Sequence, residues 1–172
     1  QTSADLLGVT RVHWLGFDDS GMDGFASENG FAAVPVETAA SALQAAISEY
    51  QPDLVTLYDR NGGYGHPDHL RVWEAGHLAM RRAALDCECW EATIDRDFLA
   101  EGIRMLEQFG TNLDGDFGSW LGESERFLSA GEIEIRIDVR SVAAARRGSL
   151  AAHRSQGASP DSSSRMLALA SA

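Results

Sequence analysis

The most constraining feature of this sequence is a short apolar run followed at once by a segment rich in glycine and histidine. The run is residues 53–58, DLVTLY, and the segment that follows is residues 59–69, DRNGGYGHPDH. A short apolar run bounded by proline and glycine is typical of a buried strand. Pro67 fits the first turn of a helix because it lacks an amide hydrogen, and Asp68 favours the positive end of a helix dipole. The sequence therefore predicts a strand, a loop and then a helix that begins between His66 and Asp68.

Strand-like and helix-like patterns alternate along most of the chain. Strands are predicted over residues 11–17, 53–58, 86–94 and 132–139, and helices over residues 37–50, 68–85, 95–109 and 141–154. The segment EIEIRIDV has the most regular alternation of apolar and charged residues, as a half-exposed strand requires. Alternating strands and helices indicate βαβ units, so we expect an α/β fold with a largely parallel sheet.

Composition limits the classes of partner. A chain of 172 residues with 44% hydrophobic residues can form one core without needing two domains. A formal net charge of -12 opposes non-specific binding to nucleic acid, because phosphate contacts need clustered lysine and arginine. No apolar run approaches the length of a membrane span. We therefore expect neither a nucleic acid nor a membrane as partner, and composition leaves the oligomeric state open.

Two cysteines, Cys87 and Cys89, form a CxC pair. Such a pair can bind soft metals, but no second pair of cysteines or histidines stands nearby, so two ordinary strand thiols are the favoured interpretation. Two cysteines offer no disulfide framework, which favours a reducing, cytoplasmic location.

His66 and His69 are three residues apart, so they share a face in the first turn of the predicted helix. Neutral imidazole is a common ligand for zinc, and a catalytic zinc usually takes three protein ligands and leaves a fourth position for water. One or both histidines can therefore bind a metal. The alternative is a plain helix start with solvated histidines, in which the glycines only form a turn.

Three stretches of the chain resemble one family. Residues 62–69, GGYGHPDH, preceded by TLYD, are similar to a signature of the LmbE-like, or PIG-L, zinc-dependent deacetylases. This form resembles most the actinobacterial branch that acts on mycothiol and its precursors. Residues 15–22, LGFDDSGM, and residues 150–156, LAAHRSQ, are similar to two other segments of the family, in the same order. The resemblance covers about residues 6–157 and implies a Rossmann-like sheet flanked by helices.

The resemblance implies a role for several residues. It makes His69 the zinc ligand, and His66 the group that stabilises the oxyanion or protonates the leaving amine. Asp68 would orient His66. Tyr64 matches a mobile tyrosine whose hydroxyl can reach the same oxyanion, and Asp19 lies where a substrate hydroxyl is contacted.

His153 lies in the third similar stretch, where the resemblance implies a substrate or structural contact. A histidine near the end of a helix is also favoured by the helix dipole alone. These two interpretations of His153 stay open.

One family segment is absent from these 172 residues. Family members open with a strand followed by AHPDDE, which supplies two further metal ligands and the aspartate base. We therefore expect residues 1–157 to be a partial LmbE-like domain that lacks its first strand and helix, followed by a Ser/Ala-rich tail over residues 158–172. We also expect the chain on its own to hold zinc weakly and to be inactive.

Two classes of function follow. The favoured one is a zinc-dependent hydrolase that removes an acetyl group from a small N-acetylated sugar, an N-acetylglucosaminyl compound of the GlcNAc-inositol kind, with a mycothiol-conjugate amidase as its variant. The rival is a non-catalytic sugar-binding α/β domain that keeps only part of the pocket.

Overall fold

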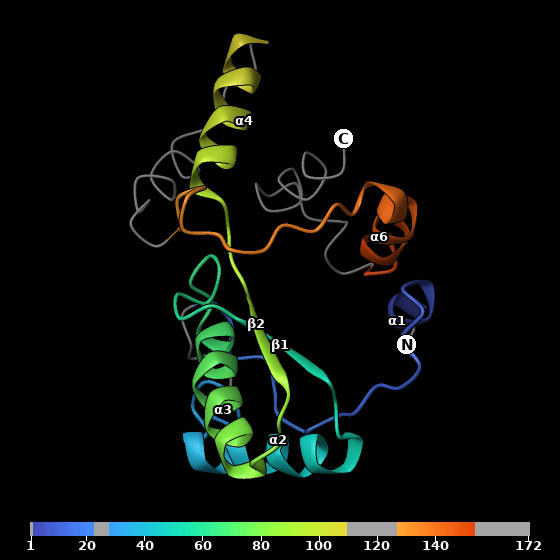
Figure 1. Ribbon diagram of the computed structural model, residues 1–172, viewed down its shortest axis with the longest axis vertical. Coiled ribbons are helices and arrows are strands. Elements are labelled where there is room, and N and C mark those ends of the chain that lie inside the picture. The colour runs from blue at the N-terminus through green and yellow to red at the C-terminus, as the bar shows by residue number, and fades with distance from the viewer. Residues whose placement is uncertain (1, 23–27, 110–126, 154–172) are drawn as a thin grey trace. The chain divides into compact units, whose positions relative to one another are not determined.

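The structure is a computed structural model that describes residues 2–22, 28–109 and 127–153. Its elements, in chain order, are α1 (Thr2–Leu6), α2 (Val36–Tyr50), β1 (Leu54–Tyr58), α3 (Pro67–Ala83), β2 (Glu88–Ala92), α4 (Arg96–Gln108), the 3-10 helix η2 (Arg140–Val142) and α6 (Ala143–Ala151) (Figure 1). The chain divides into two compact units, one of Leu15–Glu134 and one of Gln1–Trp14 with Ile135–Ala172.

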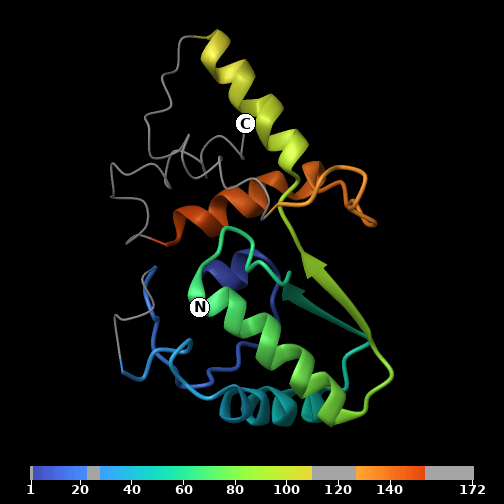
Figure 2. The same cartoon turned by 90° about the vertical axis from the view of Figure 1, so that its left-hand side faces the viewer.

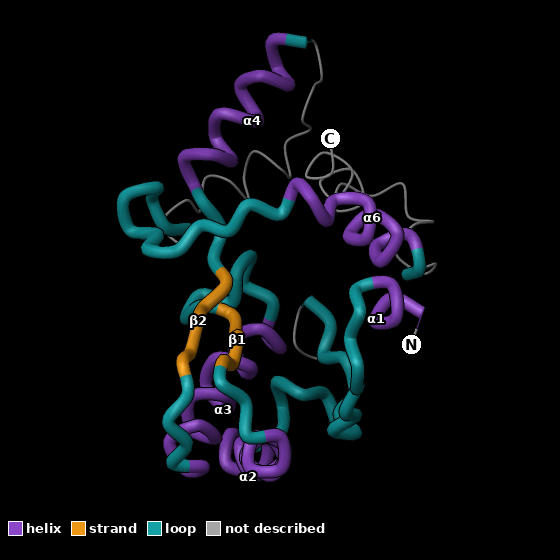
Figure 3. The backbone as a smooth tube through the Cα atoms, turned by 45° about the vertical axis from the view of Figure 1, so that its right-hand side comes forward, coloured by secondary structure: helices purple, strands orange, loops and turns teal. Residues whose placement is uncertain are grey.

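The larger unit is built on a β1–α3–β2 motif. The two strands pair in parallel, from Leu54 opposite Glu88 to Tyr58 opposite Ala92, and lie side by side in Figure 3. A parallel pair needs a crossover connection, which α3 provides. The α/β class is therefore confirmed. The larger Rossmann-like sheet stays a prediction.

Small residues bring the helices of this unit close together. The core between α2 and α3 consists of four fully buried alanines, Ala39, Ala40, Ala75 and Ala79. Larger, partly buried side chains pack against them, among them Phe31, Leu43, Ile47 and Leu78. Helix α3 also contacts β1 (Figure 2). At Gly76 a Cβ atom would lie 2.6 Å from the Leu57 side chain, so the glycine allows the helix to approach the strand.

The predicted helices are confirmed, with small shifts at their ends. Helix α3 begins at Pro67, as the proline signal predicts, and it ends at Ala83 rather than at Leu85. The earlier end has a local cause. Ala84 adopts the left-handed conformation, with φ of 49°, and its N–H still bonds to the carbonyl of Met80, which closes the last turn.

Two predicted strands are wrong, those over residues 11–17 and 132–139. Neither segment forms a ladder with another strand among the described residues, where the bridges outside β1 and β2 are Asp18 with Gly30 and Asp95 with Leu128. Ile137 is 63% exposed. An alternating pattern produces a strand only when its backbone groups find a partner strand.

The smaller unit joins α1 to α6. The hydroxyl oxygens of Ser3 and Ser149 lie 2.6 Å apart, and Nε2 of His153 lies 3.1 Å from the Ser3 hydroxyl. The domain boundary at residue 157 stays a prediction, and residues 158–172 lie outside the described residues. In the part of the chain that is described, no helix combines the length and the apolar character that crossing a membrane requires.

Candidate functional site

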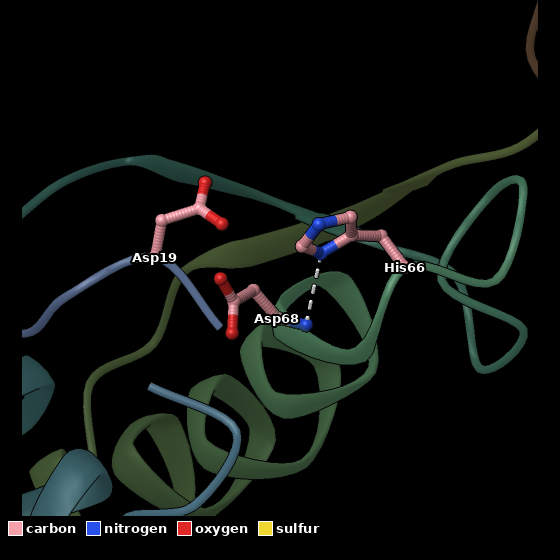
Figure 4. Close-up of side chains that lie close together, drawn as sticks. All are labelled: Asp19, His66 and Asp68. Carbon is pink, nitrogen blue, oxygen red and sulfur yellow. Dashed lines mark hydrogen bonds between the residues drawn. The ribbon is translucent and has the colours of Figure 1, made fainter. Parts of the chain in front are cut away.

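His66 is the N-cap residue of α3, and its backbone conformation is extended. Its Nδ1 atom accepts a hydrogen bond of 3.1 Å from the backbone N–H of Asp68 (Figure 4). A neutral imidazole has one donor and one acceptor nitrogen, so an accepting Nδ1 leaves the hydrogen on Nε2. His66 therefore presents an N–H donor at Nε2.

His69, in the first turn of α3, is held in the opposite tautomer. Its Nδ1 lies 3.1 Å from the carbonyl oxygen of Gly62, and because a carbonyl only accepts, Nδ1 must donate. The Nε2 atom keeps its lone pair. Burial is the largest cause that lowers the pKa of His69 from its usual 6.5, which favours the neutral ring. A neutral imidazole whose far nitrogen donates to a carbonyl is the usual form of a histidine that binds metal.

The glycines between the strand and the helix are required by geometry. Gly62, Gly63 and Gly65 have φ values of 64°, 61° and 88°, a region that residues with a side chain rarely adopt. At Gly62 a Cβ atom would also lie 3.0 Å from the backbone nitrogen of Leu70 and 3.2 Å from Cβ of His69. The glycines therefore let the loop lie directly against the first turn of α3.

Asp68 connects α3 to the segment around Ser20. Its two carboxylate oxygens accept the backbone N–H groups of Ser20 and Ala32, each at 3.1 Å. Ser20 is fully buried, and its hydroxyl accepts from the same Ala32 N–H at 2.9 Å. The Asp68 group that bonds to His66 is the backbone amide, so the orienting role of the carboxylate stays a prediction. Sequence reasoning missed Ser20, whose one signal is its place in the LGFDDSGM stretch.

Asp19, His66 and Asp68 form a cluster of possible metal ligands. One ligand atom from each lies within 4.8 Å of the others, and Figure 4 shows the three side chains meeting from two segments of the chain. The Asp19 carboxylate is exposed and accepts the N–H of Gly21 at 2.7 Å. The sequence predicted the metal on His69, whose ring centre is 5.0 Å from that of His66. The tautomers favour His69, because Nε2 of His66 already carries a hydrogen.

Aromatic rings surround the two histidines. Tyr58 stacks on His69, with ring centres 3.7 Å apart and an interplanar angle of 7°. Tyr64 meets His69 edge-on at 5.0 Å and His66 at 6.1 Å. Burial, with smaller effects from Tyr58 and Asp19, raises the pKa of Tyr64 above its usual 10.0. The Tyr64 hydroxyl therefore stays protonated at neutral pH and can donate a hydrogen bond.

His153, the other predicted substrate contact, lies in the smaller unit beside Ser3. Its role stays a prediction.

Comparison with known proteins gives the following similarities. The family described as PIG-L: GlcNAc-PI de-N-acetylase matches residues 1–80. A 1D-myo-inositol 2-acetamido-2-deoxy-alpha-D-glucopyranoside deacetylase of Acidothermus cellulolyticus is 32% identical over 163 residues, covering 87% of this chain and 54% of that protein. The protein of the same name from Rhodococcus jostii is 34% identical over 177 residues, covering 90% and 58%. A mycothiol S-conjugate amidase of Streptomyces coelicolor is 40% identical over 85 residues, covering 46% and 29%. The chain spans about half the length of the inositol-glucosamine deacetylases that it matches.

Proposed function

The chain belongs to the PIG-L family through residues 1–80, and on that premise we propose that the complete protein is a hydrolase that removes the acetyl group from an N-acetylglucosaminyl-inositol substrate. The observation that carries the proposal is the pair of histidines in opposite tautomers at the carboxyl end of β1. One offers a hydrogen-bond donor and the other a lone pair, and the carboxyl ends of parallel strands are where α/β proteins bind their ligands. The names of the relatives from A. cellulolyticus and R. jostii agree with this reaction.

We further propose that zinc is the cofactor. Imidazole nitrogen is a ligand that zinc takes, and the free Nε2 of His69 offers one such atom. His69 would hold the ion. When bound, zinc supplies a Lewis acid that polarises the acyl carbonyl.

The remaining residues act on the substrate through hydrogen bonds. Nε2–H of His66 would donate a hydrogen bond to the carbonyl oxygen as negative charge develops there. The Tyr64 hydroxyl would donate to the same oxygen. Asp68 would hold His66 in place through the start of α3, and Asp19 and His153 are the proposed contacts to sugar hydroxyls. The products are the free amine and acetate.

The aspartate base that the family resemblance implies belongs to the AHPDDE segment, which these 172 residues do not contain. We therefore propose that the chain on its own is inactive toward such substrates and holds zinc weakly.

A second candidate is hydrolysis of mycothiol S-conjugates. The observation that favours it is the 40% identity to the S. coelicolor amidase over 85 residues. Assaying the full-length protein with both substrates separates the two. Acetate release from an N-acetylglucosaminyl-inositol supports the first, and cleavage of a mycothiol S-conjugate without acetate release supports the second. Binding of the sugar without any hydrolysis would instead support the non-catalytic rival.

The test of the two histidines uses His66→Ala and His69→Ala in the full-length protein, with zinc content and acetate release as readouts. His66→Ala should keep its zinc and lower kcat about a hundredfold or more, because one proton donor or oxyanion contact is typically worth that much. His69→Ala should lose the metal. His77→Ala is the matched control, since His77 lies further along α3 and bonds to Glu91 at 2.7 Å. If His66→Ala loses zinc and His69→Ala keeps it, the two roles are reversed.

A further inference from the structure

We propose that Asp59 is a positioning residue of this site: it holds the glycine loop so that the Gly62 carbonyl fixes the tautomer of His69. The inference rests on the proposed function, because the tautomer matters when His69 binds a metal. Asp59 is 4% exposed and follows directly after β1. It does not belong to the ligand cluster of Asp19, His66 and Asp68 in the described structure.

The Asp59 carboxylate is bonded on both of its oxygens. Oδ1 accepts the backbone N–H groups of Asn61 and Gly63, each at 3.0 Å. Oδ2 accepts the hydroxyl of Thr93 at 2.6 Å. Both oxygens of the carboxylate are therefore engaged in holding the loop. Asp59 would act on the site through the position of the loop, and not by contacting substrate or metal.

These contacts connect the loop to the ends of both strands. Thr93 follows directly after β2, as Asp59 follows β1, and the Asp59 N–H bonds to the carbonyl of Ala92 at 3.1 Å. The loop is therefore attached to the sheet at two points that are 34 residues apart in the sequence. Loss of the carboxylate would leave the buried N–H of Gly63 and the partly buried N–H of Asn61 without this acceptor, which is costly.

Gly62 lies between the two residues whose amides bind Asp59. The Gly63 N–H belongs to the same peptide group as the Gly62 carbonyl, so its bond to Asp59 helps to fix the direction of that carbonyl. The Gly62 carbonyl oxygen lies 3.1 Å from Nδ1 of His69 and also accepts the N–H of Gly65 at 3.1 Å. The Tyr58 ring also restrains His69, by stacking at 3.7 Å. Stacking sets the plane of the imidazole ring but not its orientation within that plane, because a half-turn of the ring keeps the stack. The Gly62 carbonyl is thus the contact that selects which nitrogen carries the hydrogen.

The test uses the metal-free chain and reads the His69 tautomer from its ring ¹⁵N chemical shifts, at about pH 8 where histidine is neutral. Wild type should show hydrogen on Nδ1. Asp59→Ala should show a mixture of tautomers and, when zinc is added in competition with a chelator, about 10- to 100-fold weaker zinc binding, as expected when the support of a metal-binding histidine is lost.

Two further variants separate positioning from folding. Asp59→Asn should keep the wild-type tautomer and most of the zinc affinity, because the amide oxygen can accept both N–H groups and the amide nitrogen can donate to the Thr93 hydroxyl. Thr93→Val removes only that hydroxyl, with little change of shape, and should give a partial shift in the same direction as Asp59→Ala. If Asp59→Ala does not fold, Thr93→Val decides.

Asp95→Ala is the matched control. The Oδ1 atom of Asp95 also accepts two backbone N–H groups, those of Asp97 and Phe98 at 3.0 Å each, at the start of α4. It should leave the His69 signals unchanged. An equal change in the control, or a wild-type tautomer in Asp59→Ala or in the deciding Thr93→Val, would overturn the inference. Zinc binding that survives His69→Ala would instead overturn the proposed metal role, while the tautomer measurement still tests Asp59.

Discussion

The β1–β2 pair and the segment of residues 132–139 differ in what surrounds their apolar side chains. Leu57 of β1 is 9% exposed, lies beneath α3 at Gly76, and belongs to a strand with a parallel partner. Ile137 is 63% exposed, and its segment has no strand beside it in the described structure. The second segment has the more regular alternation of apolar and charged residues. A partner strand and a covering helix, rather than the alternation, therefore distinguish the region that forms a sheet.

The candidate site lies beside the region that has a partner strand and a covering helix. The loop that leads to His66 and His69 begins at the end of the paired strand, and two of its backbone amides are bonded to the buried carboxylate of Asp59. In residues 132–139 the carboxylate of Asp138 also accepts a backbone N–H, that of Arg140, but it is exposed. Site residues need such support because their side chains must be held in one orientation.

The largest expected effect compares the two regions directly. Leu57→Ala should lower the free energy of unfolding by about 2–5 kcal/mol, because it leaves a cavity under α3. Ile137→Ala should change it by less than about 0.5 kcal/mol, because the side chain is already exposed. Urea denaturation of both variants measures this. A cost at Ile137 as large as that at Leu57 would mean that residues 132–139 pack against something and that the contrast is false.

The second effect concerns the glycine loop. Gly62→Ala should lower the free energy of unfolding by about 2–3 kcal/mol, from the positive φ and the contacts with Leu70 and His69 together. Gly8→Ala is the control, because Gly8 has φ of 74° but no heavy atom within 4 Å of the added Cβ. Gly8→Ala should lower the free energy of unfolding by about 1 kcal/mol, which is the cost of placing a residue with a side chain at positive φ. Equal losses in urea denaturation would show that the close approach at Gly62 adds nothing.

Local signals in the sequence were sufficient for part of this fold. The DLVTLY run predicts β1, and Pro67 with Asp68 predicts the start of α3, because strand burial and helix capping depend on neighbouring residues. Residues 132–139 show the limit, since the pattern cannot tell whether a partner strand is present. The site was also visible in the sequence, because its histidines and glycines lie within a few residues of each other.

The contacts that hold the site were beyond sequence reasoning because they join distant segments. The carboxylate of Asp68 bonds to Ser20, 48 residues away, and that of Asp59 to Thr93. The tautomers of the histidines depend on which nitrogen faces which backbone group. A sequence motif names the residue types but does not contain that information.

The smallest expected effect is the pH dependence that His69 adds to the stability of the site region. Burial lowers the pKa of His69 in the folded chain below its unfolded value of 6.5, so between the two values the unfolded state binds the proton more readily. The contribution to stability is therefore present above pH 6.5 and is lost as the pH falls through the folded pKa. His69→Asn keeps a donor for the Gly62 carbonyl but cannot be protonated, so without metal it should lose less stability than wild type between about pH 8 and about pH 5. Urea denaturation across that range, with a chelator present, measures the difference between the two curves. Parallel curves would show that His69 is as easily protonated in the folded chain as in the unfolded one, and that the site region is less well enclosed than its contacts indicate.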